Sequence, residues 1–85
     1  MKFLFTQEAW DDFEWFLDNN KRLARHIRLL LKDISRAPEE GVGKPERLRF
    51  QLTGFWSRRI NKEHRLVYRV EQDTVIVISC RFHYE

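Results

Sequence analysis

The side chains best suited to chemistry include a pair at the carboxyl end of the chain. The last seven residues, SCRFHYE, place His83 and Tyr84 within three positions of the terminus, where most domains fray. An imidazole can donate or accept a proton near neutral pH. Combined with a carboxylate base and with arginines that stabilise phosphate charge, it could serve RNA cleavage by attack of the 2′-hydroxyl without a metal.

Glu46 is the carboxylate best placed to act as that base. It lies in a segment, residues 44–69, that carries eight basic and two acidic side chains, whereas residues 7–20 carry five acidic side chains and no Lys or Arg. Arginines that project from one face of a sheet could bind a polyanion. The same segment could also be an ordinary solvated strand surface, and Glu46 a simple surface ion pair.

Composition limits the classes of protein to which the chain can belong. Its 85 residues, 42% of them hydrophobic, suit a single domain spanning residues 1–85. Cys80 is the only cysteine, so no intrachain disulfide is possible, and no CxxC pair or Cys/His cluster has the spacing of a zinc site. We expect neither a metal nor a cofactor. The chain shows no signal peptide and no run of ~20 apolar residues. We therefore expect a cytoplasmic protein without membrane contact.

The spacing of apolar residues predicts the elements that must position these side chains. After a short strand, Thr6 is a good helix N-cap, and apolar residues with helical spacing follow up to Asn19 and Asn20. A second helix continues to Ala37, and the loop PEEGVGKPE follows it. The period then changes to two. Strands are predicted near residues 3–5, 47–50, 55–60, 64–70 and 74–82.

The resulting order, βααββββ, predicts an α+β fold in which two N-terminal helices pack as a hairpin on one face of a small antiparallel sheet. A three-residue loop at residues 71–73 would place Arg65 opposite Ser79. It would then put Arg65, Arg81 and His83 on the helix-free face. The side chains expected under the helices are Leu66, Tyr68, Val70, Ile76, Ile78, Cys80 and Phe82.

The preceding hairpin leaves two pairings open. A two-residue loop places Arg58 opposite Arg65, whereas a three-residue loop places Arg59 there. Two adjacent guanidinium groups indicate a bound phosphate, unless a carboxylate such as Glu63 or Glu71 neutralises them. The other two histidines, His26 and His64, are expected to be inert.

Three stretches of this sequence resemble a known family. GVGKPERLRF, GFWSRRINKEHRLVYRV and CRFHY are similar to the YoeB/Txe branch of the RelE-type toxins of bacterial type II toxin-antitoxin systems, and the N-terminal FTQEAWDDFEWF fits the same branch. The resemblance covers essentially the whole chain. It implies a RelE-like microbial RNase fold and a ribosome-dependent mRNA endoribonuclease (mRNA interferase) that cuts mRNA in the ribosomal A site and inhibits translation.

The resemblance also implies roles for individual residues. Glu46 corresponds to the general base, Arg65 to the phosphate-stabilising arginine and Arg59 to a supporting cation. His83 corresponds to the histidine usually assigned as the general acid, and Tyr84 to the family's terminal tyrosine.

Other positions depart from the family pattern or extend it. Arg49 stands where a lysine is common, Arg47 replaces a usual proline, and Glu85 is an additional residue. By their charge, further candidates for binding RNA phosphate are Lys44, Arg49, Arg58 and Arg81.

The implied partners are a YefM/Axe-like antitoxin that covers the site with its C-terminal segment, the 70S ribosome with mRNA, and a second copy in a homodimer. Trp15, off the apolar stripe of its helix, could contact such a partner or be a stray exposed aromatic. An alternative function is a non-catalytic RNA- or ribosome-binding module. A DNA-binding regulator ranks last, because the sequence contains no helix-turn-helix pattern.

Overall fold

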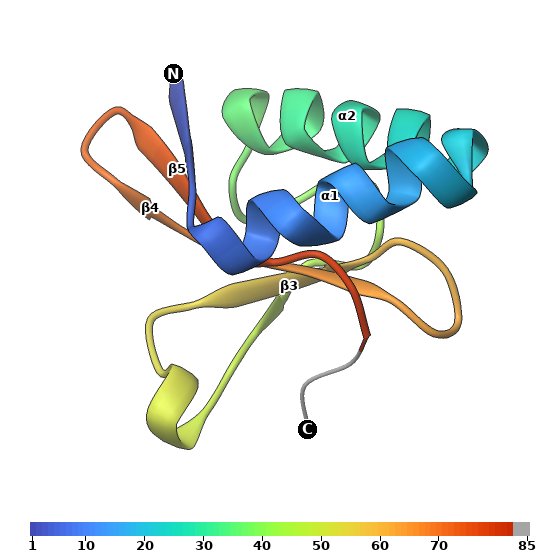
Figure 1. Ribbon diagram of the computed structural model, residues 1–85. Coiled ribbons are helices and arrows are strands. Elements are labelled where there is room, and N and C mark those ends of the chain that lie inside the picture. The colour runs from blue at the N-terminus through green and yellow to red at the C-terminus, as the bar shows by residue number, and fades with distance from the viewer. Residues whose placement is uncertain (83–85) are drawn as a thin grey trace.

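The structure is a computed structural model, and it describes residues 1–82. One strand, two helices and four strands follow one another along the chain, which confirms the predicted order (Figure 1). A short 3-10 turn, η1, separates the second and third strands. The elements are β1 (Lys2–Phe5), α1 (Gln7–Asn19), α2 (Lys21–Arg36), β2 (Glu46–Arg47), η1 (Phe50–Leu52), β3 (Trp56–Arg59), β4 (Arg65–Glu71) and β5 (Thr74–Ser79).

A single residue, Asn20, ends α1 and begins α2. Its backbone N–H donates to the Phe16 carbonyl at 2.7 Å, and its side-chain oxygen accepts the Leu23 N–H at 3.2 Å. Both helix ends are therefore satisfied without an intervening loop. The chain reverses at this point, and α2 returns beside α1 as the predicted hairpin (Figure 1). No helix in residues 1–82 is long and apolar enough to cross a membrane.

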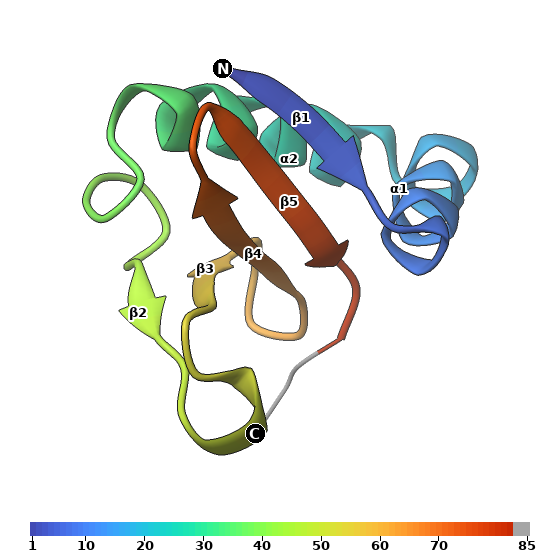
Figure 2. The ribbon, with the colours of Figure 1, turned by 90° about the vertical axis from the view of Figure 1, so that its left-hand side faces the viewer.

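The strands form one mixed sheet in the order β1-β5-β4-β3-β2. Strands β2 to β5 pair antiparallel, as predicted, and β1 adds to β5 in parallel at the edge. Both helices lie on the same side of the sheet (Figure 2). We call the uncovered side the open face.

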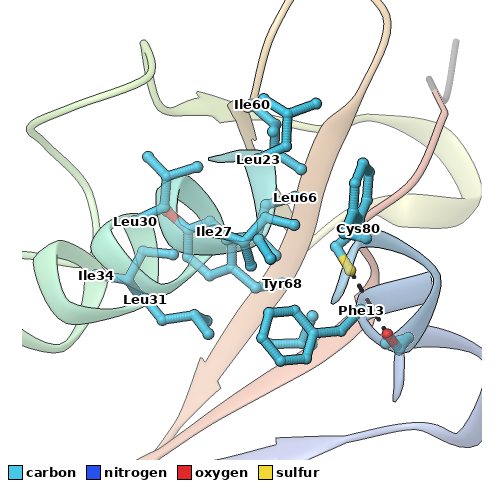
Figure 3. Close-up of a cluster of buried hydrophobic side chains, with 14 of the residues drawn as sticks. Phe13, Leu23, Ile27, Leu30, Leu31, Ile34, Ile60, Leu66, Tyr68 and Cys80 are labelled. Atoms are coloured by element: carbon cyan, nitrogen blue, oxygen red, sulfur yellow. Dashed lines mark hydrogen bonds between the residues drawn. The ribbon is translucent and has the colours of Figure 1, made fainter. Parts of the chain in front are cut away.

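The core fills the space between the helices and the sheet (Figure 3). The Cys80 thiol lies in this core, 3.5 Å from the Ala9 carbonyl, and burial raises its pKa to about 12. Each large apolar side chain removed from water contributes about 1.5–3 kcal/mol. The buried residues of the cluster are Ala9, Phe13, Phe16, Leu23, Ala24, Ile27, Leu30, Leu31, Ile34, Ile60, Leu66, Tyr68, Val75, Val77 and Cys80.

The predicted β4–β5 register was wrong by one residue. Glu71 pairs with Thr74, so the turn contains two residues rather than three. Gln72 has φ +53, the left-handed conformation that two-residue hairpin turns require. The faces of β4 remain as predicted, with Leu66 and Tyr68 in the core. In β5, however, the core side chains are Val75 and Val77 instead of Ile76 and Ile78.

An irregularity near the end of β5 restores the predicted alternation of core-facing and open-face side chains. Val67 pairs with Ser79 while Tyr68 pairs with Val77, so Ile78 is the extra residue of a bulge. Cys80 therefore reaches the core as predicted, although Ser79 does not face Arg65. The strand then ends, and Phe82, expected in the core, is 54% exposed.

The segment after the loop also differs from the prediction. A strand was expected at residues 47–50, but β2 contains only Glu46 and Arg47. The chain turns into η1 at Phe50, which has φ +58 and is 85% exposed. Glu46 thus lies at the start of a very short edge strand.

Candidate active site

Glu46 and Arg65 come together on the open face. Glu46 pairs with Ser57 of β3, which in turn pairs with Val67 of β4, and Arg65 lies two positions from Val67 on the same face. Nη1 of Arg65 donates to Oε1 of Glu46 at 3.3 Å and lies 3.5 Å from Oγ of Ser57. A candidate base and a candidate phosphate-binding cation therefore share one site. Ser57 was not predicted, although its alternation with Arg58 could have indicated its face.

Arg59 lies directly opposite Arg65 in the β3–β4 pair. The sequence left two partners open for Arg65, and Arg59 is the one expected from a three-residue loop. The connection between β3 and β4 is nevertheless longer than three residues. Asn61 and Lys62 line a pocket together with the two arginines. Clustered positive charge of this kind suits a phosphate group.

The carboxylates proposed to neutralise the arginine pair act elsewhere. Glu63 lies 3.5 Å from the His64 ring, and Glu71 forms an ion pair with Arg69. Glu46 takes that role for Arg65. Within residues 1–82, no carboxylate forms an ion pair with Arg59.

A close backbone approach delivers Glu46 to this site. The Gly43 carbonyl accepts the Arg59 N–H at 2.7 Å, so the loop lies flat against β3. Gly43 has φ +87, and a Cβ atom there would lie 2.9 Å from the Arg59 carbonyl oxygen. Only glycine fits this position without a shift of the backbone. Gly43 therefore fixes the position at which the chain enters β2.

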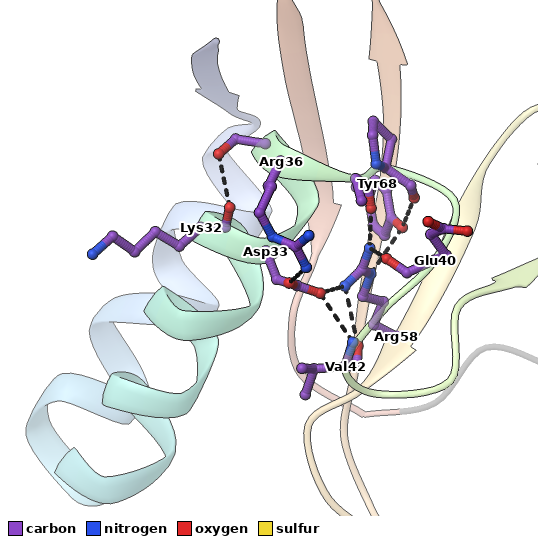
Figure 4. Close-up of polar contacts among 10 residues, drawn as sticks. Lys32, Asp33, Arg36, Glu40, Val42, Arg58 and Tyr68 are labelled. Carbon is purple, nitrogen blue, oxygen red and sulfur yellow. Dashed lines mark hydrogen bonds and ion pairs between the residues drawn. The ribbon is translucent and has the colours of Figure 1, made fainter.

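Arg58 does not face the site, contrary to the prediction that it binds RNA. It points to the helix side and is fully buried (Figure 4). A buried guanidinium must satisfy its donors within the protein, and Arg58 does so by tying the end of α2 and the following loop to β3. Its acceptors are Asp33 Oδ2 at 2.5 Å, Val42 O at 3.1 Å, Ala37 O at 2.6 Å, Glu40 O at 3.0 Å and the Tyr68 hydroxyl at 3.2 Å.

The electrostatics of this cluster depend on Asp33. Hydrogen bonds from Arg36, from the Val42 N–H and from Arg58 hold the pKa of the Asp33 carboxyl well below its usual range. The Tyr68 hydroxyl donates to the Pro38 carbonyl at 2.7 Å, and burial raises its pKa. The cluster is a structural anchor for the loop that precedes Glu46.

The remaining predicted cations occupy different places. Lys44 and Arg49 are exposed on either side of Glu46 in the sequence. Arg81, expected on the open face, instead lies against α1, with its guanidinium carbon 3.7 Å from the centre of the Trp15 ring. The reason is that β5 ends at Ser79, so strand alternation no longer applies to Arg81. Trp15 is correspondingly half-buried rather than a stray exposed aromatic.

His83 and Tyr84 lie outside the described residues. The chain leading to them runs beside β4, since the Arg65 N–H donates to the Phe82 carbonyl at 2.9 Å. The Phe82 N–H donates to Nδ1 of His64 at 2.8 Å. Sequence reasoning took His64 to be inert. No sequence signal could have indicated this contact, because its donor is a backbone N–H.

Comparison with known proteins identifies close relatives. The family described as YoeB-like toxin of bacterial type II toxin-antitoxin system matches residues 5–84. A toxin YoeB of Synechocystis is 53% identical over 85 residues, which are 100% of this chain and 99% of the relative. A toxin YoeB of Escherichia coli K12 is 49% identical over 84 residues, covering 99% and 100% of the two chains.

Solved structures of similar toxins have the same fold as this chain. A YoeB/ParE toxin from Agrobacterium tumefaciens superposes with a TM-score of 0.96 at 44% identity, covering 99% of this chain and 100% of the other. From Staphylococcus aureus, a YoeB dimer has a TM-score of 0.93 at 45% identity, and a YoeB-YefM complex 0.92 at 46%. Each of these two covers 99% of this chain and 98% of the other.

Proposed function

Because this chain belongs to the YoeB-like toxins of bacterial type II toxin-antitoxin systems, we propose that it is a ribosome-dependent mRNA endoribonuclease. It cuts mRNA in the ribosomal A site and thereby inhibits translation. The observation that carries the proposal is the 3.3 Å contact between Glu46 and Arg65, with Arg59 directly opposite Arg65. A base and two cations are among the groups that metal-free phosphodiester cleavage needs in one place, together with a general acid.

The reaction assigns one step to each group. Glu46 takes the proton of the 2′-hydroxyl, and the 2′-oxygen forms a bond to phosphorus while the bond from phosphorus to the 5′-oxygen breaks. His83 donates the proton that the departing 5′-oxygen needs, and Tyr84 orients the reacting groups. The products are a 2′,3′-cyclic phosphate and a free 5′-hydroxyl. Each positioned acid or base contributes roughly 10²–10⁴-fold in rate.

Arg65 links the base to the phosphate. A guanidinium has five N–H donors, so one group can bind Glu46 while others bind a non-bridging phosphate oxygen. Arg59 adds positive charge on the neighbouring strand. Charge that develops on the phosphate in the transition state is then stabilised by groups already held in position.

The small size of the site supports a requirement for the ribosome. Among the described residues, Arg59, Asn61, Lys62 and Arg65 line a pocket of about 290 Å³, below the ~300–1,000 Å³ typical of a small-molecule site. In-line attack needs the 2′-oxygen, the phosphorus and the 5′-oxygen in alignment. The ribosome supplies that alignment, while exposed Lys44 and Arg49 add contacts to the RNA backbone.

The partners of the relatives extend to this chain as part of the same proposal. It binds a YefM/Axe-like antitoxin, since the Staphylococcus aureus relative was solved in a YoeB-YefM complex. As a ribosome-dependent enzyme it acts in the cytoplasm. It also forms a homodimer, because the same relative was solved as a dimer.

The test is cleavage of mRNA on programmed ribosomes by the purified chain and its variants. Glu46→Gln should abolish cleavage while ribosome binding stays nearly intact, because the amide cannot accept the proton. Glu39→Gln is the matched control, since Glu39 is an exposed glutamate of the same loop, and it should cleave as the wild type does. Ribosome binding without cleavage by the wild type would favour the non-catalytic binding module instead.

A further inference from the structure

A buried histidine that the proposed mechanism does not use holds the end of the described chain. We propose that His64 is a positioning residue, which fixes the backbone at Phe82 and so sets where the chain that continues into His83 begins. The role in cleavage rests on the proposed function. The anchoring of Phe82 does not, and it can be measured separately.

Both backbone polar groups of Phe82 are bound by two consecutive residues of the hairpin. Its N–H donates to Nδ1 of His64 at 2.8 Å, and its carbonyl accepts the N–H of Arg65 at 2.9 Å. The second of these partners is the candidate phosphate-binding residue. Phe82 is therefore held in a fixed relation to Arg65, one peptide bond before the candidate general acid.

The backbone of Phe82 needs such support. Its φ is +64, a left-handed conformation that bulky residues rarely adopt. Unfavourable backbone conformations persist only where surrounding contacts hold them. The Arg65 contact alone fixes the carbonyl, whereas the His64 contact fixes the N–H on the other side of the rotated bond. His64 therefore helps to determine the direction in which the chain leaves Phe82.

His64 is itself held rigidly. It is 5% exposed, and its ring packs edge-on against Phe16 with centroids 5.0 Å apart. Its backbone N–H donates to the Asn61 side chain at 2.8 Å. Because Nδ1 accepts the Phe82 N–H, the ring proton lies on Nε2, which is 3.5 Å from Oε1 of Glu63. A fixed ring with a defined tautomer is suited to positioning another group.

Two contacts secure the chain just before Phe82. The Cys80 N–H donates to Oδ2 of Asp12 at 3.1 Å, and the Arg81 guanidinium lies over the Trp15 ring. Both attach the segment to α1. Among the described residues, the His64 contact is thus the last side-chain hydrogen bond before the chain reaches His83.

The competing interpretation is that His64 only fills space in the core. Two variants separate these interpretations, because both remove the ring and its edge-on contact with Phe16. In His64→Asn the side-chain oxygen stands as many bonds from Cβ as Nδ1 does, so it can still accept the Phe82 N–H. In His64→Gln the oxygen corresponds to Nε2 and points away from Phe82. The two variants carry the same amide group and differ by one methylene, which moves the acceptor away from Phe82.

Hydrogen exchange of the Phe82 amide, followed by NMR, tests the anchor directly. We expect exchange in His64→Gln to be faster than in His64→Asn by about five-fold or more, the effect of one typical hydrogen bond. Core amides such as that of Leu66 should exchange equally in the two variants. Equal exchange of Phe82 in both variants overturns the proposal. The wild type gives the same answer without a variant, through a scalar coupling between the Phe82 amide nitrogen and His64 Nδ1, whose absence also overturns it.

The kinetic test uses His83 as a reporter. On programmed ribosomes, His64→Gln should have a kcat about ten-fold or more below that of His64→Asn, with little change in KM, because misplacement slows the chemical step. In a His83→Gln background this difference should vanish. A difference that persists there overturns the positioning role. His26→Gln, on α2, controls for loss of a histidine. If the wild type cleaves nothing, the proposed function fails, while the Phe82 exchange rates still decide the anchor.

Discussion

Oε1 of Glu46 and Nη1 of Arg65 lie 3.3 Å apart, although their strands do not touch each other. Strand β3 lies between β2 and β4 and pairs with both. The contact therefore depends on the register of two strand pairs at once. Ser57 of β3 lies between the candidate base and the candidate phosphate-binding cation, and its small side chain leaves room for both.

Replacement of Arg65 should distinguish charge from geometry. Arg65→Lys keeps the charge but cannot bind Glu46 and a phosphate oxygen with one planar group. We expect both Arg65→Ala and Arg65→Lys to lower kcat for codon cleavage on ribosomes, the alanine variant by about 10²–10³-fold. Single-turnover cleavage measures the effect. A lysine variant as active as the wild type would show that charge alone suffices.

Arg59→Ala should mainly weaken binding. Arg59 lies opposite Arg65 on the open face, where it can neutralise one phosphate. Loss of one such contact should reduce the slope of the logarithm of affinity against the logarithm of salt concentration by about one. Titration of fluorescent ribosomes at several salt concentrations measures the slope. Arg22→Ala, an exposed arginine of α2, is the control and should leave the slope unchanged.

Arg58 should matter for stability rather than for RNA. It is fully buried, and its removal leaves Asp33 and three backbone carbonyls without a shared donor. We expect Arg58→Met to lower the free energy of unfolding by about 3 kcal/mol, as measured by urea denaturation. Arg36→Met removes the exposed partner of Asp33 and should have a small effect. Equal effects of the two substitutions would contradict the anchor role.

Asp33 should make the protein sensitive to acid. The pKa of its carboxyl is well below the usual value in the folded chain, whereas an unfolded aspartate has a pKa of about 3.9. A lowered folded pKa stabilises the fold above the unfolded value, and this contribution is lost as the pH falls toward the folded pKa. Urea unfolding from pH 7 to pH 3 should show a smaller loss of stability for Asp33→Asn than for the wild type. A decline of equal size in both would contradict the assignment.

Much of the fold could be predicted from local patterns. The change of apolar period from 3.6 to two gave the order of elements, and Thr6 marked the start of α1 through a hydrogen bond that the structure contains. The β4–β5 register could not be predicted, because it depends on the φ of Gln72 and on the bulge at Ile78. Neither has an unambiguous sequence signal.

The candidate site, like the fold, could be predicted from the sequence only in part. Glu46 and Arg65 were predicted as partners in one reaction, and they meet. The roles of Arg58 and Arg59 could not be separated, because the sequence does not reveal which of two adjacent arginines faces the helices. His64 was missed since its contact is with a backbone N–H, which leaves no trace in the identity of Phe82.

The alternation of Ser57, Arg58 and Arg59 along β3 limits how this protein can evolve or be redesigned. A one-residue insertion or deletion on either side of β3 that shifts its pairing would exchange the two arginines. The buried anchor and the RNA-facing cation would then fail together, even though the amino-acid composition of the strand would be unchanged. Natural variation in the flanking loops should therefore come as changes of length that preserve the parity of the strand. Libraries built on this scaffold should randomise loop sequence before loop length.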